Sequence, residues 1–255
     1  MNLYLWVDLL ILVFPLALSF DRKVRYVRRW PAAAASALLV GLPYAAWDSF
    51  MAARGAWAFS DRFAGAGRLL FLPLGEYLFF LVVPFACLFV SEVVRAYLPE
   101  KTVRPLRLPW IVIAAACGLA AVLCGARLYT ATVLLATGIF LLLAAALAPG
   151  MLASRRFWLS MLACYLPFLL ANGLLTGLPV VTYDAGTILG PRAFSIPVED
   201  FLYSFSMIGM NFLAFRFLVQ RLPGPRRTGN PPAAPRDRSH DERQEQGARE
   251  NKHEE

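Results

Sequence analysis

The chain has 255 residues, of which 58% are apolar, and its mean hydropathy is +0.55. These values exclude an ordinary soluble globular domain and favour several segments long enough to cross a bilayer. The formal charge of +8 does not indicate nucleic-acid binding, because the arginine and lysine residues lie in short connections between apolar stretches and in a polar C-terminal segment. The composition therefore predicts an all-α integral membrane protein.

Seven apolar stretches of spanning length follow one another along the chain, each bounded by charged residues, proline or glycine. They lie at about 3–20, 31–53, 69–94, 109–126, 129–149, 157–178 and 194–219. The first stretch lacks the basic start and the small-residue cleavage site of a signal peptide, so we expect an uncleaved first span. The sequence thus predicts seven transmembrane helices.

The positive charges favour one orientation of these helices. Five arginine or lysine residues follow the first stretch and many follow the last, and the excess alternates between the connections. Because connections rich in arginine and lysine stay in the cytoplasm, we expect the N-terminus outside and the C-terminus inside a cell inner (plasma) membrane. The segment 222–255 has almost no large apolar residues and is predicted to be a disordered cytoplasmic tail.

An internal repeat relates the two halves of the chain. Without gaps, a shift of 124 residues superimposes equivalent residues of the two halves: Pro73 with Pro197, Glu76 with Asp200, Asp48 with Asn172, and Arg68 with Arg192. We therefore expect a first three-helix repeat at 1–98, a linker helix at 99–127 and a second three-helix repeat at 128–221. A single linker helix makes the two repeats parallel, so both acidic motifs should open a helix at the outer side of the membrane.

Four carboxyl groups are candidate site residues: Asp48, Glu76, Glu199 and Asp200. An acid in the first turn of a helix can simply cap it, because it meets free N–H groups and the positive end of the helix dipole. Two acidic openings at repeat-equivalent positions favour a further role, since an ionisable group within a membrane costs several kcal/mol unless it is paired or functional. Histidines and lysines lie outside the predicted spans, which leaves carboxyl groups as the candidate proton donors.

Aromatic residues stand close to these acids in the sequence: Trp47, Trp57, Phe79, Phe201 and Tyr203. Aromatic belts at membrane interfaces account for many such residues. Ring faces can also stabilise a passing cation without reacting with it, which makes these side chains candidates for substrate binding. Arg68 and Arg192 either pair with the carboxylates or serve topology, and Glu92 and Arg95 are expected to form an ordinary surface pair.

Four stretches of the chain carry a resemblance to a known family: "YAAWDSFMAARGAWAF", "FLPLGEYLFFLVVPFACLF", "NGLLTGLPVVTYD" and "LGPRAFSIPVEDFLYSFSMIGMN". Together they resemble the membrane-embedded lycopene cyclases, in which two small homologous subunits occur separately or fused in tandem. The resemblance covers nearly all of residues 1–220. It implies an isomerase that converts the linear ends of lycopene into β-ionone rings, without net redox change and without the flavin fold of the unrelated cyclases. No cofactor and no metal are expected.

Carried over to this chain, the family motif implies three catalytic candidates, Glu76, Glu199 and Asp200. Asp48 and Asn172 are repeat-equivalent polar partners, and we expect Asp48 to be catalytic and Asn172 to bind substrate. The chain departs from the family at Gly75, where the first motif usually has an acid. Because Gly75 corresponds to Glu199 in the repeat, Glu199 is the better candidate for the proton donor. The departure leaves open whether one ring or two are closed.

Two other functions are left open by the sequence. A cyclase that acts on a different carotenoid would use the same residues. A small-solute transporter with a three-plus-one-plus-three helix architecture would also have parallel repeats, although carriers usually place their polar residues near the midplane of the membrane. The expected partners are lycopene or a related carotenoid taken from the lipid phase and membrane lipid, and a homo-oligomer is left open.

Overall fold

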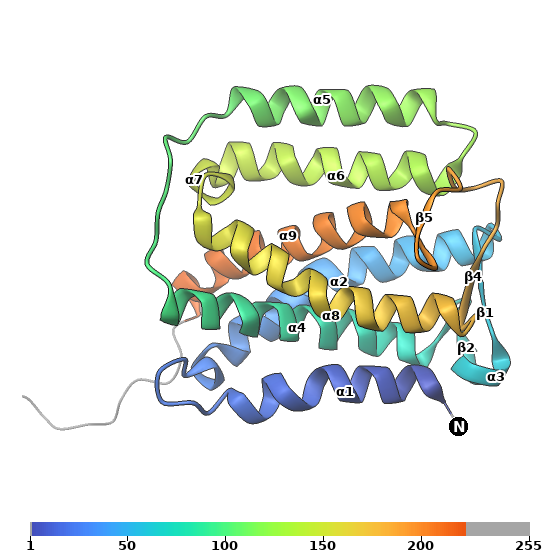
Figure 1. Ribbon diagram of the computed structural model, residues 1–255, viewed down its shortest axis with the longest axis horizontal. Coiled ribbons are helices and arrows are strands. Elements are labelled where there is room, and N and C mark those ends of the chain that lie inside the picture. The colour runs from blue at the N-terminus through green and yellow to red at the C-terminus, as the bar shows by residue number, and fades with distance from the viewer. Residues whose placement is uncertain (1, 223–255) are drawn as a thin grey trace, which may run out of the picture. The chain divides into compact units, whose positions relative to one another are not determined.

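The computed structural model describes residues 2–222 and shows a mostly helical chain, as predicted (Figure 1). The long helices are α1 (Leu3–Leu18), α2 (Trp30–Ala53), α4 (Leu74–Tyr97), α5 (Leu108–Leu123), α6 (Leu128–Leu147), α8 (Arg155–Gly177) and α9 (Val198–Arg221). The short elements are η1 (Tyr26–Arg29), β1 (Trp57–Phe59), α3 (Asp61–Ala64), β2 (Arg68–Leu69), β3 (Leu72–Pro73), α7 (Pro149–Leu152), β4 (Val181–Tyr183), β5 (Arg192–Ala193) and β6 (Ile196–Pro197). The tail predicted at 222–255 lies outside the described residues, apart from Leu222.

Several of the helices have the length and composition of membrane spans. Helices α4, α6, α8 and α9 are long and apolar enough to cross a bilayer, and α1 and α5 are shorter apolar helices of 16 residues each. These helices indicate an integral membrane protein. The count of seven spans and their division into two repeats stay predictions.

The predicted stretches 69–94 and 194–219 begin too early, because a short hairpin precedes each helix. Strand β2 pairs with β3 and strand β5 pairs with β6. The chain turns between β2 and β3 at Leu70 and Phe71, whose φ angles are 45° and 70°, a left-handed conformation that ends the extended run. Each hairpin ends at the proline that directly precedes a helix, Pro73 or Pro197, where a missing N–H removes no helical hydrogen bond.

The elements recur at the spacing of the sequence repeat. Helix α4 and its hairpin correspond to α9 and its hairpin at an offset of 124 residues, with identical bounds at both ends. In Figure 1, α4 and α9 both begin at the end of the helices where the strands lie. This recurrence supports the proposed pair of parallel repeats.

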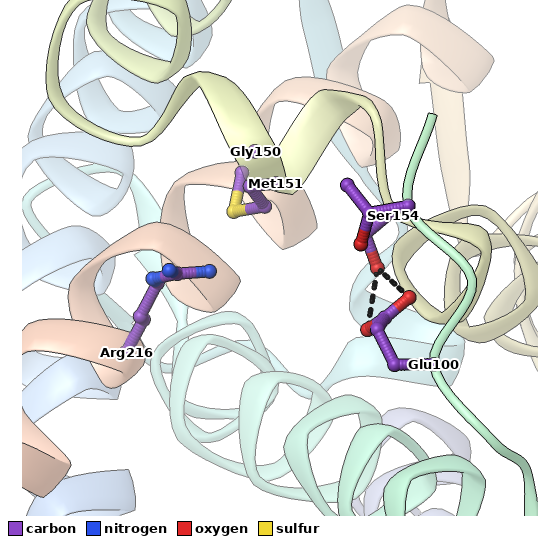
Figure 2. Close-up of a pocket in the computed structure, with 6 residues that line it drawn as sticks. Glu100, Gly150, Met151, Ser154 and Arg216 are labelled. Carbon is purple, nitrogen blue, oxygen red and sulfur yellow. Dashed lines mark hydrogen bonds between the residues drawn. The ribbon is translucent and has the colours of Figure 1, made fainter. Parts of the chain in front are cut away.

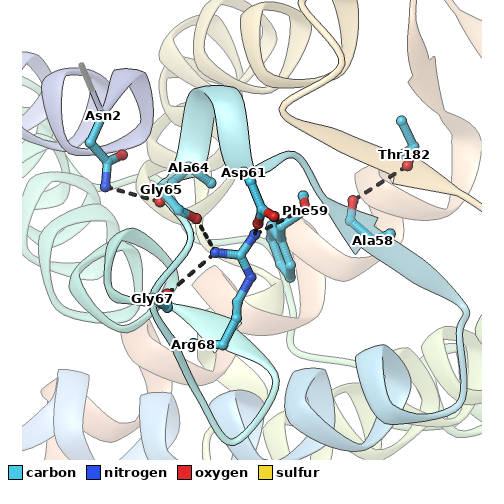
Figure 3. A network of polar contacts seen from close by, with 9 residues as sticks. All are labelled: Asn2, Ala58, Phe59, Asp61, Ala64, Gly65, Gly67, Arg68 and Thr182. Carbon is cyan, nitrogen blue, oxygen red and sulfur yellow. Dashed lines mark hydrogen bonds and ion pairs between the residues drawn. The ribbon is translucent and has the colours of Figure 1, made fainter.

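A strand pair joins the two halves of the chain at this end. Strand β1 runs antiparallel to β4, and Ala58 lies opposite Thr182, its own equivalent in the repeat. Thr182 also donates a side-chain hydrogen bond to the carbonyl of Ala58, as Figure 3 shows. The connections after α2 and after α8 are therefore held together close to the start of α9, where Tyr183 of β4 donates a hydrogen bond to Asp200.

One expected surface pair is part of a buried ion cluster. Glu92 on α4 is only 3% exposed, and its Oε2 contacts Arg29 at 2.9 Å and Arg95 at 2.5 Å. The predicted Glu92–Arg95 pair is confirmed, but its placement at the surface was wrong, because Glu92 is buried and also contacts Arg29 from the connection before α2. Two guanidinium groups compensate the buried carboxylate.

Helices α6 and α9 approach each other closely at a glycine. A Cβ atom at Gly209 would lie 2.6 Å from Cε1 and 2.7 Å from Cε2 of Phe140, whose ring is fully buried. Side chains cannot interpenetrate in this way, so only glycine lets the Phe140 ring lie against the backbone of α9. This contact fixes the spacing between the helix that opens with Glu199 and its neighbour.

Replacing Gly209 by alanine should therefore destabilise the protein. We expect Gly209→Ala to lower the free energy of unfolding by about 1–3 kcal/mol, because the Phe140 ring must shift within a packed core. Gly118→Ala is the matched control, since no atom lies within 4 Å of the added carbon on α5 and alanine favours a helix. Thermal unfolding in detergent measures both, and equal stability of the two variants would contradict the packing described.

Candidate active site

Two of the predicted acids meet between helices of the first half. Asp48 on α2 is 4% exposed and Glu76 on α4 is 7% exposed, and their carboxyl groups are close enough to hydrogen-bond. Such a bond requires a proton on one of them, because ionised carboxylates only accept. Tyr4 of α1 donates to Glu76 Oε2 at 2.5 Å, and Tyr203 of α9 donates to Asp48 Oδ1 at 2.9 Å.

The third acid, Asp200, is held by three donors. Tyr129 donates to Oδ1 at 2.7 Å, and Tyr183 and Asn172 each donate to Oδ2 at 2.8 Å. Burial and the neighbouring Asp200 raise the pKa of the Tyr183 phenol on β4 well above its usual value, so its hydroxyl stays a donor. Asn172, predicted as a substrate-binding residue, is thus placed in the structure as a hydrogen-bond donor to Asp200, together with two tyrosines.

Aromatic rings connect these acids into one cluster, which we call the acid cluster: Asp48, Glu76 and Asp200. The Tyr203 ring lies 5.0 Å from that of Trp47 and 6.4 Å from that of Tyr129. Trp57 packs edge-on against Tyr129 at 5.1 Å. The sequence-predicted Trp47, Trp57 and Tyr203 therefore surround the acids of both halves, as the repeat suggested.

Glu199 does not join the acid cluster, although it is adjacent to Asp200. Successive helical residues point about 100° apart, so the two side chains leave α9 on different sides. Glu199 is 1% exposed, and its Oε1 accepts from Thr130 Oγ1 at 2.7 Å and from the backbone N–H of Leu189 at 2.6 Å. Its Oε2 is buried without a hydrogen-bond partner among the described residues.

An apolar cavity of about 490 Å³ lies beside Glu199. Its walls come from α6, from the connection before β5, from β5 itself and from α9: Thr130, Val133, Leu134, Leu189, Ala193, Val198, Glu199, Phe201 and Leu202. This volume is within the usual range for small-molecule sites. Apart from Thr130, Glu199 is the polar side chain of a wall otherwise made of hydrocarbon and aromatic groups, which suits an apolar ligand and a single proton transfer.

The remaining predicted aromatic residues separate into two places. Phe201 lines the cavity and stacks on Tyr165 at 6.1 Å with an interplanar angle of 13°. Phe79 does not reach this cavity and packs edge-on against Tyr4 at 6.4 Å, in the first half. Of the two, Phe201 is therefore the one placed to meet a ligand beside Glu199.

Sequence reasoning missed four donors that hold the acids: Tyr4, Tyr129, Thr130 and Tyr183. Tyr4 and Tyr129 are equivalent in their hydrogen bonds but 125 residues apart, one more than the repeat, so a shift without gaps hides them. Asp8 on α1 is also buried, with neither carboxyl oxygen hydrogen-bonded among the described residues.

The two repeat-equivalent arginines do not pair with the candidate carboxylates. Arg68 contacts Asp61 at 2.7 Å and donates to the carbonyls of Phe59 and Gly65 (Figure 3). Arg192 donates to the carbonyl of Ser195 at 2.7 Å. The pairing considered from the sequence was wrong, because the contacts of both arginines are with the short connections that contain the strands.

A second cavity, of about 310 Å³, differs from the first in chemistry. It is lined by Glu100, Thr102, Gly150, Met151, Ser154 and Arg216. Figure 2 shows Arg216 across this cavity from Glu100, whose carboxylate accepts a hydrogen bond from Ser154. Arg216 lies near the end of α9, far along the helix from Glu199.

Within residues 2–222, no group of three or more acids, histidines or cysteines is placed to hold a metal ion.

Comparison with known proteins identifies a family. The family model described as Lycopene cyclase matches residues 1–94 and 126–218, which is most of the chain, and confirms the resemblance seen in the sequence motifs. The unmatched residues between the two segments include α5, the predicted linker helix. No curated protein and no solved structure matched the chain.

The hydrogen bonds to Asp200 predict a large effect of a small change. Asp200→Asn places an amide NH₂ against groups that are themselves donors, so we expect the free energy of unfolding to fall by about 2–3 kcal/mol or more. Asp61→Asn is the control, because the Asp61 side chain is 74% exposed and its contact with Arg68 should contribute less than about 1 kcal/mol. Thermal unfolding in detergent compares them, and a smaller loss for Asp200→Asn than for Asp61→Asn would refute the role given to the three donors.

Proposed function

The chain belongs to the lycopene cyclase family, and from this premise we propose that it closes the linear end groups of lycopene into β-ionone rings. Family membership supports carotenoid cyclisation, and the β-ionone product is the part that we propose. The observation that carries the proposal is Glu199, a buried carboxyl group with one unpartnered oxygen in the wall of an apolar cavity.

Glu199 is proposed as the general acid. Its Oε1 is occupied by two hydrogen-bond donors, Thr130 and the Leu189 N–H, so a proton on the carboxyl group belongs on Oε2. Since Oε2 has no acceptor nearby among the described residues, the π electrons of a bound alkene are the base available to it. The carboxyl group is thereby oriented, and the buried Oε2 is the oxygen proposed to carry the reacting proton.

The proposed reaction moves one proton in and one proton out. Glu199 protonates C2 of the terminal C1=C2 double bond, which leaves a tertiary cation at C1. The C5=C6 double bond attacks C1, so that a C1–C6 bond forms and the positive charge moves to C5. Loss of the C6 proton to the Glu199 carboxylate restores the C5=C6 double bond and the acid, and no electrons are exchanged with a cofactor.

The walls of the cavity are suited to such a cation. Phe201 presents an aromatic ring, whose face stabilises positive charge without forming a bond to it. The aliphatic walls, including Val133 and Leu202, exclude water that would otherwise trap the cation as an alcohol. They also favour a folded end group, in which the reacting double bonds lie close together.

We assign a positioning role to the acid cluster. Asp200 follows Glu199 directly, and its three donors come from α6, β4 and α8, so they fix the first turn of α9 and with it the direction of the Glu199 side chain. Asp48 and Glu76 support the same region through Tyr203. Trp47 and Trp57 pack around these groups rather than in the cavity wall.

The proposed setting is a cell inner membrane, with lycopene entering the cavity from the lipid phase. The N-terminus would lie outside and the C-terminus in the cytoplasm, so that Glu199 stands near the outer surface at the start of α9. A solute carrier would need a polar path along the helices, whereas the cavity beside Glu199 is apolar. Cyclisation is therefore favoured over transport.

Pigment analysis in a bacterial host that accumulates lycopene tests the function. The intact protein should convert red lycopene to cyclic, yellow carotenoids. Glu199→Gln should lower the rate at least about 100-fold, because a general acid contributes about 10²–10⁴-fold and the amide of glutamine has no acidic proton to transfer. Separation and mass measurement of the pigments show the products, whose mass equals that of lycopene.

Glu100→Gln is the matched control for that experiment. Glu100 also lines a cavity, but the polar one that includes Arg216, so its neutralisation should leave the pigment unchanged. Unaltered lycopene with intact protein in the membrane would refute the proposed function. Full activity of Glu199→Gln would refute the assignment of the acid alone.

Thr130 is predicted to be a positioning residue for Glu199. Thr130→Val removes the hydrogen bond to Oε1 and should lower kcat by about 10- to 100-fold with little change in KM, because the acid loses its orientation while the cavity keeps its shape. Thr130→Ser should restore most of the activity. Thr132→Val is the control, since that hydroxyl bonds only to carbonyls of its own helix, and an equal loss in both valine variants would contradict this role.

A further inference from the structure

Given the function proposed above, on which this step rests, we infer that the chain has one cyclisation site, around Glu199 in its second half. In the first half, Tyr4 takes the place of the equivalent acid side chain. The two ends of one lycopene molecule must then react in separate visits to the same cavity.

The inner acids of the two halves are alike. Glu76 and Asp200 occupy equivalent positions in α4 and α9, and each accepts a hydrogen bond from a tyrosine on the first helix of its own half. Tyr4 donates to Glu76 at 2.5 Å, and Tyr129 donates to Asp200 at 2.7 Å. The duplication is therefore preserved at this position.

The preceding position differs completely between the halves. Glu199 carries a carboxyl group beside the apolar cavity, whereas its equivalent is Gly75. A Cβ atom at Gly75 would lie 2.7 Å from Cγ and 2.9 Å from Cβ of Tyr4, which is closer than side chains approach each other. No side chain at position 75 can be accommodated without moving Tyr4.

Tyr4 is firmly held in this place. Its side chain is 2% exposed, and its ring packs against Phe79 at 6.4 Å and Phe59 at 6.5 Å. Its hydroxyl is tied to Glu76. The space that an acid side chain at position 75 would occupy is thus taken by the packed Tyr4 ring.

A single site has a consequence for the order of products. After the first ring has closed, the monocyclic molecule must leave the cavity and return with its other end. Linear and monocyclic carotenoids then compete for one cavity, so excess lycopene should delay the second closure. If a site in each half acted on the two ends of one bound molecule, the second closure would not depend on that competition.

The experiment measures linear, monocyclic and bicyclic pigments over time in membranes that contain the intact full-length chain or Glu199→Gln. We expect Glu199→Gln to lose both closures together, at least 100-fold each. A tenfold excess of lycopene over the amount that saturates the intact protein should raise the ratio of monocyclic to bicyclic product several-fold. Thr130→Val provides a second route if Glu199→Gln fails to fold, and it should slow both closures by the same factor within about twofold.

Accumulation of monocyclic product by Glu199→Gln would overturn the single site, because the first half would then be closing a ring by itself. Slowing of only one closure in Thr130→Val, or a product ratio that does not respond to excess lycopene, would overturn it as well. These results differ from failure of the proposed function, in which the intact protein would form no cyclic pigment at all.

Discussion

The interior of a bilayer cannot solvate a charged or polar group, so each buried carboxyl group of this chain must find its partners within the protein. Asp200 accepts three hydrogen bonds from three other elements, and Glu76 and Asp48 accept one each from tyrosines on neighbouring helices. These bonds are formed between helices rather than within them, so they set the register of α1, α2, α4, α6 and α9 at one end of the protein. Two acids are exceptions among the described residues: Asp8 has no hydrogen bond to either carboxyl oxygen, and Glu199 has one oxygen without a partner. Of these two, Glu199 is the one that lines the apolar cavity, so it is the acid proposed to react, while the acids with partners position the site.

The pair Glu199 and Asp200 shows how one helix start serves both purposes. A rotation of about 100° between neighbouring residues directs one carboxyl group to the tyrosines and the other to the cavity. The hairpin before α9 and the Gly209 contact with Phe140 hold the helix in place along its length. The start of α9 is therefore held by groups outside the cavity, while Thr130 and Leu189 in the cavity wall orient the Glu199 carboxyl group itself. This division of roles explains why an acid cluster would surround a reaction that uses a single proton.

Much of this arrangement could be predicted from the sequence, because hydropathy and a strict spacing of 124 residues report helices and their duplication directly. The candidates Asp48, Glu76, Asp200, Trp47, Trp57 and Tyr203 were found in this way, and the structure brings them together. The hairpins were missed because Leu70, Phe71 and Phe194 are apolar and read as the start of a span, although each has a positive φ. The donors Tyr4 and Tyr129 were missed because a one-residue offset in the first helix of each repeat breaks the alignment. Which of two adjacent acids faces a cavity depends on packing between distant helices, and no local pattern records it.

The two halves differ in more than one residue of the site. In the second half Glu199 depends on the Thr130 hydroxyl, directly after Tyr129. In the first half the residue directly after Tyr4 is Leu5, which has no hydroxyl to donate. Restoring an acid at Gly75 would thus require the loss of the Tyr4 packing and would still leave the new carboxyl group without its orienting donor in a membrane interior. Position 75 has no acid, no orienting hydroxyl beside it and no room for a side chain, so in the proposed reaction the first half serves as the support that holds the second half in its active geometry.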